Sequence, residues 1–134
     1  MTGQSTAGSG PRYRRRGDSL VEFALIVSVL MTIIIGIIDF GRAVYAYSVV
    51  ANAAREGARY GVMAPDDHAG ITARIHDTAV GLDPAQLSIS VTNAETTIEV
   101  SVSYNFELVT PLMADVLGSG SLTLSSSASM YTGY

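Results

Sequence analysis

The 134-residue sequence predicts an α+β fold shaped like a lollipop, in which a long N-terminal transmembrane helix extends into a small head. Three observations predict it. Residues 20–38 form an apolar run that holds a single charge, Glu22. Residues 71–82 repeat apolar side chains at about one helical turn, and from residue 87 the repeat changes to every second residue. The head is therefore expected to hold a second helix and a three-stranded antiparallel sheet.

The apolar run is long enough to cross a membrane. Nineteen helical residues at ~1.5 Å each cover ~28 Å, about the thickness of a bilayer's hydrocarbon core. A secretory signal peptide has a shorter apolar region, roughly 7–15 residues, and ends in a small-residue cleavage site. Here the run passes into Asp39 and Phe40 without an Ala-x-Ala pattern. The rest of the chain is too small to bury such a helix on all sides, so we interpret the run as a membrane span.

The charges orient this span. Arg14, Arg15 and Arg16 precede it, and the positive-inside bias places them in the cytoplasm and everything after about Asp39 outside. From residue 18 onward the chain has four arginines and twelve acids, a net charge of −8. An acidic outer domain disfavours nucleic acid as a partner. The chain has no cysteine, which excludes disulfides and thiolate metal sites.

The helix is expected to continue beyond the span, because no residue breaks it before Pro65. We therefore expect four segments: a basic cytoplasmic leader at 1–17, the span at 18–39, an extracytoplasmic helical extension at 40–64, and the head at 65–134.

The predicted extension carries a narrow stripe of mostly small residues at alternating steps of three and four. Its members are Phe40, Ala43, Tyr47, Val50, Ala54, Gly57 and Gly61. Such a seam allows another backbone to approach closely. The partner is either the protein's own sheet or the helix of a second copy in a homo-oligomer.

The head begins after Pro65, where Asp66 or Asp67 can cap a second helix. Three alternating runs follow. They are Leu87, Ile89 and Val91; Ile98, Val100, Val102, Tyr104 and Phe106; and Leu122, Leu124, Ser126, Ala128 and Met130. Each run gives a strand with one apolar and one polar face, so the sheet needs helices to cover its apolar face.

The boundary between the leader and the span has an unusual pattern. Three arginines precede Gly17, and Glu22 follows five places later inside the apolar run. A carboxylate among apolar residues is costly unless a cation meets it. The alternative is that Gly17 only begins the helix and Glu22 lies at headgroup level, where a helix N-terminus favours a negative charge.

This boundary resembles the prepilin processing site of the type IV pilin superfamily. Several stretches together resemble the TadE-like family of Flp (tight adherence) pilus proteins. They are SLVEFAL at 19–25, IDFGR at 38–42, NAAREGARYG at 52–61 and VTPL at 109–112.

The resemblance implies a minor pilin or pseudopilin, pilin-like in fold, that takes part in assembly or structure of a Flp pilus. It implies cleavage by a prepilin peptidase between Gly17 and Asp18, with Glu22 kept in the mature chain. It also implies the bacterial cytoplasmic membrane, with membrane lipid, other pilins and the pilus secretion machinery as partners. Asp18 stands where many pilins have a hydrophobic residue that becomes N-methylated, and Phe23 stands where Flp pilins commonly have tyrosine. The alternative is a permanently anchored accessory protein whose outer domain binds a partner at the cell envelope.

Two local charge patterns lie on the predicted extension. Asp39 and Arg42 are three residues apart, which predicts a local ion pair. Arg55, Glu56 and Arg59 form either a solvated helix face or a contact between subunits.

No pattern indicates catalysis, a cofactor or a metal. The two histidines, His68 and His76, lack the His-x-x-x-His helical spacing, although acids lie nearby. The serines near the C-terminus lack a Ser–His–Asp context. We expect that the protein is not an enzyme.

Overall fold

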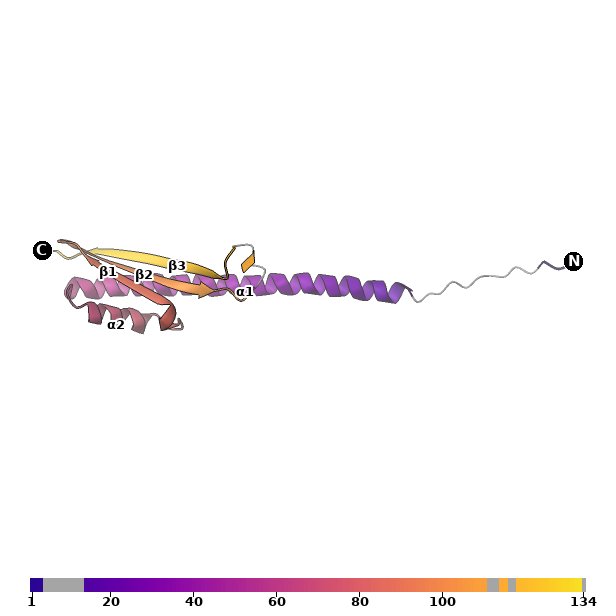
Figure 1. The fold of residues 1–134 in the computed structure, drawn as a ribbon, viewed down its shortest axis with the longest axis horizontal. Helices are drawn as coiled ribbons and strands as arrows, with labels where there is room; N and C mark the ends of the chain where they lie inside the picture. Colours follow the sequence, from indigo (N-terminus) through magenta and orange to yellow (C-terminus); the bar gives the residue numbers. More distant parts are fainter. Residues whose placement is uncertain (4–13, 111–113, 116–117, 134) are drawn as a thin grey trace. The chain divides into compact units, whose positions relative to one another are not determined.

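The structure, a computed structural model, describes residues 1–3, 14–110, 114–115 and 118–133. Most of the predicted leader, residues 4–13, lies outside this range, as does part of the VTPL stretch. The elements are α1 (Arg14–Met63), α2 (His68–Thr78), the 3-10 helix η1 (Pro84–Gln86), β1 (Leu87–Asn93), β2 (Thr97–Glu107) and β3 (Ser121–Tyr131) (Figure 1). The predicted α+β class is confirmed, with a long apolar N-terminal helix, a second helix and a three-stranded antiparallel sheet.

The chain divides into two compact units, Met1–Ile35 and Gly36–Tyr134. In the described part of the first unit, the regular element is the N-terminal portion of α1. The second unit holds the remainder of α1, α2 and the whole sheet. The boundaries predicted at residues 17, 39 and 64 stay a prediction.

Helix α1 ends at Met63, because the residues that follow disfavour a helical conformation. Proline disfavours the α conformation of the residue before it, and Pro65 therefore prevents α1 from continuing through Ala64. The Ala64 N–H donates to the Tyr60 carbonyl over 3.1 Å, which satisfies one acceptor at this end.

Helix α2 begins at a side-chain cap. Asp67 is the N-cap, and its carboxylate accepts from the Gly70 N–H over 2.9 Å. The apolar face of α2 is buried through Ile71 and Ile75. After the helix, Gly81 has φ +81°, a left-handed conformation that glycine adopts without strain.

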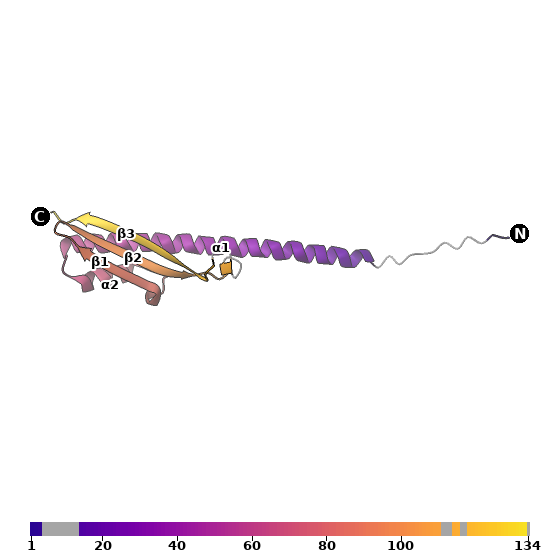
Figure 2. The ribbon, with the colours of Figure 1, turned by 45° about the horizontal axis from the view of Figure 1, so that its top comes forward.

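The sheet has the order β1-β2-β3, and both pairs are antiparallel (Figure 2). In this register apolar residues lie opposite apolar residues: Val91 opposes Val100, which in turn opposes Ala128 on β3. One residue along, Ser90 opposes Ser101 on the other face. Alternation thus separates an apolar face from a hydroxyl-rich one, as the period of two predicts.

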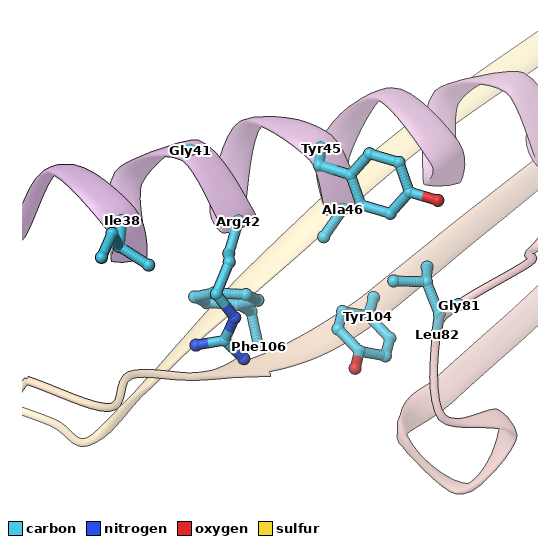
Figure 3. Close-up of a pocket in the computed structure, with 9 residues that line it drawn as sticks. All are labelled: Ile38, Gly41, Arg42, Tyr45, Ala46, Gly81, Leu82, Tyr104 and Phe106. Atoms are coloured by element: carbon cyan, nitrogen blue, oxygen red, sulfur yellow. The ribbon is translucent and has the colours of Figure 1, made fainter. Parts of the chain in front are cut away.

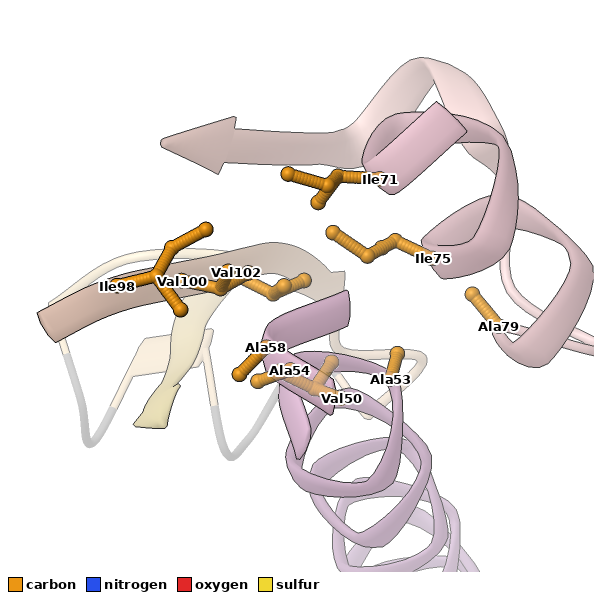
Figure 4. Close-up of a cluster of buried hydrophobic side chains, with 10 residues drawn as sticks. All are labelled: Val50, Ala53, Ala54, Ala58, Ile71, Ile75, Ala79, Ile98, Val100 and Val102. Carbon is orange, nitrogen blue, oxygen red and sulfur yellow. The ribbon is translucent and has the colours of Figure 1, made fainter. Parts of the chain in front are cut away.

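The core of the second unit lies where α1, α2 and β2 meet (Figure 4). Its buried members are Val50, Ala53, Ala54, Ala58, Ile71, Ile75, Ala79, Ile98, Val100 and Val102. Alanines on α1 face larger aliphatic side chains on α2 and β2, so the backbone of α1 comes close to both. Each fully buried Val or Ile contributes about 1.5–3 kcal/mol of transfer free energy, so these side chains hold the unit together.

Candidate functional site

The predicted processing residues lie near the beginning of α1. Gly17, Asp18 and Glu22 are all helical and exposed. Among the described residues nothing lies within 4 Å of the place where a Cβ on Gly17 would stand. Packing within the described chain therefore does not require glycine there. The three preceding arginines belong to the same helix.

The apolar run on α1 is unburied in the structure. Leu20, Val21 and Phe23 are each more than three-fifths exposed, and most apolar side chains that follow them in the run are also exposed. Within the described residues one helix is long and apolar enough to cross a membrane, and none of its most apolar window is buried. An apolar surface of this length is compatible with a helix that crosses a membrane.

The predicted packing stripe divides into two parts. Val50 and Ala54 are fully buried, and Gly57 and Gly61 lie against side chains of α2 and β2. A Cβ on Gly57 would stand 2.7 Å from the Ile75 Cγ1 atom. This part of the stripe packs within its own chain.

The earlier part of the stripe is largely exposed in the described structure. Phe40 is 70% exposed and Tyr47 is 49% exposed, while Ala43 is partly buried. Exposed aromatic rings on one helix are available to a second helix or to lipid.

Two of the three charged residues near the end of the stripe, Glu56 and Arg59, form a local ion pair. Arg59 donates to both carboxylate oxygens of Glu56, through Nε over 3.0 Å and through Nη2 over 2.7 Å. Arg55 is exposed. The pair is accessible to solvent, so it contributes little to the stability of the isolated chain.

Asp39 has a role that sequence reasoning missed. Its side chain is 2% exposed, and one carboxylate oxygen accepts from the Val109 and Thr110 N–H groups and from the Thr110 hydroxyl. The other oxygen accepts from Arg42 over 3.1 Å, which confirms the predicted ion pair. Arg42 in turn lies over the Phe106 ring, 5.1 Å from its centroid. Asp39 therefore fastens the segment after β2 to α1. The only local trace of this site was the spacing to Arg42, because its main partners lie about 70 residues away.

A cavity of about 370 Å³ opens beside this cluster (Figure 3). Arg42 and Tyr45 line it from α1, and Tyr104 and Phe106 line it from β2. The Tyr45 hydroxyl donates to the Val80 carbonyl over 3.3 Å. The cavity is thus aromatic, with one guanidinium in its wall.

No metal-binding group was found in the described part of the chain: no three His, Cys, Asp or Glu residues gather there. Asp67, the acid next to His68, accepts from the Tyr60 hydroxyl over 2.9 Å as well as from the Gly70 N–H.

A family model described as TadE-like protein matches residues 17–59. The chain is TadE-like over this segment. The match covers 43 of the 134 residues and includes the predicted processing residues Gly17, Asp18 and Glu22, the apolar run and most of the packing stripe. It confirms the resemblance predicted from the sequence. No curated protein and no solved structure matches the chain. The TadE-like segment indicates a protein related to the Tad pilus, with an N-terminal apolar helix that can span a membrane.

Proposed function

We propose that this chain is a minor pilin or pseudopilin that takes part in the assembly or structure of a Flp (tight adherence) type IV pilus. The observation that carries the proposal is the TadE-like segment, which coincides with an unburied apolar helix. The helix anchors the chain in the bacterial cytoplasmic membrane before assembly, with residues after about Asp39 outside. Other pilins and the pilus secretion machinery are its partners.

Processing by a prepilin peptidase is part of this proposal. The cut falls between Gly17 and Asp18 and removes the arginines that orient the helix. The mature chain keeps Glu22, whose carboxylate then pairs with the new α-amine of its own or a neighbouring copy. Such a pair offsets the cost of a carboxylate among apolar residues and guides the packing of helices in a filament or its tip.

The mass of the protein extracted from membranes tests the processing step. In a strain with active prepilin peptidase, we expect the N-terminus at Asp18, and the full-length chain when Gly17 is changed to Leu. Gly36→Leu is the matched control, because Gly36 is a second helical glycine with nothing within 4 Å of its Cβ position. It should be processed like the wild type. A wild-type chain that keeps residues 1–17 in that strain would contradict the cleavage.

The alternative is an accessory protein that stays anchored and binds a partner at the cell envelope. Sheared surface filaments distinguish the two. A structural subunit is recovered in the filament fraction, whereas an anchored factor is recovered only with the membranes.

A further inference from the structure

Arg42 lines the aromatic cavity, and only part of the hydrogen-bonding capacity of its guanidinium is used within the described structure. Asp39 accepts from Arg42 Nη1, and within the described part of the chain no other acceptor bonds to this side chain. The guanidinium carbon lies 5.1 Å from the centroid of the Phe106 ring, and this contact together with the Asp39 bond restricts the positions that its remaining N–H groups take. Its side chain is 49% exposed. A planar donor fixed in this way suits the paired oxygens of a phosphodiester.

A second cavity of about 160 Å³ adjoins the first and shares Arg42, Tyr104 and Phe106 with it. Its wall adds two carboxylates, Asp83 and Glu107, which no arginine pairs in the described structure. Asp83 uses one oxygen to accept from a backbone N–H of η1. The two cavities therefore place one cationic group beside two anionic groups.

This charge pattern discriminates between ligands. Asp39 already balances the charge of Arg42, so the two carboxylates leave the combined site negative. A free phosphate dianion would be repelled by them. A ligand with both a phosphodiester and an ammonium group offers an anionic group to Arg42 and a cationic group to Asp83 and Glu107.

The position of the site on α1 selects the source of such a ligand. Ile38 lines the first cavity and is the last residue of the apolar run, and Arg42 follows one helical turn later. If the run spans the bilayer, Arg42 and Tyr45 reach the headgroup layer, where arginine and tyrosine are favoured.

We propose that the two cavities bind the headgroup of a zwitterionic phospholipid, with its phosphodiester on Arg42 and its primary ammonium on Asp83 and Glu107. The proposal rests on the membrane anchorage proposed above. The first cavity has the size of a small-molecule site, and Ile38 contributes an apolar side chain to its wall. A bound lipid would hold the base of the head at the membrane surface until the chain is extracted for assembly.

Native mass spectrometry of the full chain in detergent tests the site. The probes are dihexanoyl phosphatidylethanolamine, dihexanoyl phosphatidylglycerol and inorganic phosphate. We expect the ethanolamine lipid to bind about tenfold more tightly than either competitor, the energy of one charge-assisted contact. Arg42→Gln should lower its affinity about tenfold, whereas Arg59→Gln, which removes an arginine remote from the cavities, should leave it unchanged.

A second variant separates binding from folding. Asp83→Asn with Glu107→Gln leaves the Asp39 contacts intact and should abolish the preference for ethanolamine over glycerol headgroups. Near-ultraviolet circular dichroism reports whether each variant keeps its tertiary packing. Equal binding of the ethanolamine lipid by wild type and a folded Arg42→Gln variant would overturn the proposal. So would phosphate or the glycerol lipid binding as well as the ethanolamine lipid. Processing after Gly17 and recovery in filaments do not depend on these results, so a failure here is distinguishable from a failure of the pilin proposal.

Discussion

Gly57 is a position where α1 packs closely against α2 and β2, and adding one methyl group there should destabilise the fold. A Cβ at residue 57 would stand 2.7 Å from Ile75 Cγ1, 2.8 Å from Ile75 Cδ1 and 3.2 Å from Val100 Cγ1. Favourable contacts between carbon atoms lie at about 3.5–4.0 Å. Ile75 is fully buried, so Gly57→Ala forces its side chain or the neighbouring elements of the core to shift.

The magnitude follows from two opposing effects. Overpacking a core costs about 1–3 kcal/mol, and replacing glycine by alanine within a helix returns about 1 kcal/mol. Gly41→Ala isolates the second effect, because nothing lies within 4 Å of its Cβ position. We expect Gly57→Ala to lower the free energy of unfolding by about 1 kcal/mol and Gly41→Ala to raise it by up to about 1 kcal/mol.

The assay is denaturant unfolding of the full chain in detergent, followed by the near-ultraviolet circular dichroism of tyrosine. The chain has seven tyrosines and no tryptophan, so this signal reports tyrosine packing. Changing Ile75 to Ala should cost less in the Gly57→Ala background than alone, because the new methyl group fills part of the cavity. Equal shifts for the two glycine variants, or additive effects with Ile75→Ala, would refute the close approach of α1 to α2.

Two further predictions concern carboxylates. Asp39→Ala should lower the free energy of unfolding by about 2–4 kcal/mol, because it leaves the Thr110 N–H and hydroxyl without their buried acceptor. The same denaturation assay should show little change for Glu56→Ala, whose carboxylate is part of a solvent-accessible pair, and equal effects of the two variants would contradict the role of Asp39. The Gly70 N–H holds the pKa of Asp67 below its ordinary value, so the cap contributes fully above the unfolded-state pKa of about 3.9 and is lost as pH falls through the lower folded-state pKa. Hydrogen-exchange protection of α2 should therefore fall in that acidic range for the wild type and stay flat for Asp67→Asn, which keeps a capping oxygen but does not titrate.

The strands and the second helix were predictable because each has a regular repeat over several turns or residues. The period of two through Ile98, Val100 and Val102 identified the face of β2 that is buried. Asp67 was one of two adjacent candidates for the N-cap of α2, because Asp66 and Asp67 both precede its apolar face. The strands and α2 could therefore be predicted from residues that are close together in the sequence.

The Asp39 site was not predictable in the same way. Its spacing to Arg42 predicted a local ion pair, but its other contacts come from Val109 and Thr110, far along the chain. A single sequence carries no periodic trace of such a contact. The cavity beside Phe106 was missed for the same reason, because its walls come from α1 and β2 together.

The packing stripe on α1 was visible in the sequence, but its partner was not. Val50, Ala54, Gly57 and Gly61 share their spacing and small size with Ala43, which the core does not cover fully. Which part of the stripe is buried depends on where α2 and the sheet end, and that is a property of the tertiary structure.

The most direct test of the proposed function is the yield of surface filaments from a strain that lacks this chain. The pilin proposal predicts that filaments are lost or sharply reduced in that strain and are restored by the wild-type chain but not by Gly17→Leu. It also predicts the chain in the sheared filaments of the restored strain, with its N-terminus at Asp18. Undiminished filaments without the chain, together with recovery of the chain only in membranes, would contradict the proposal.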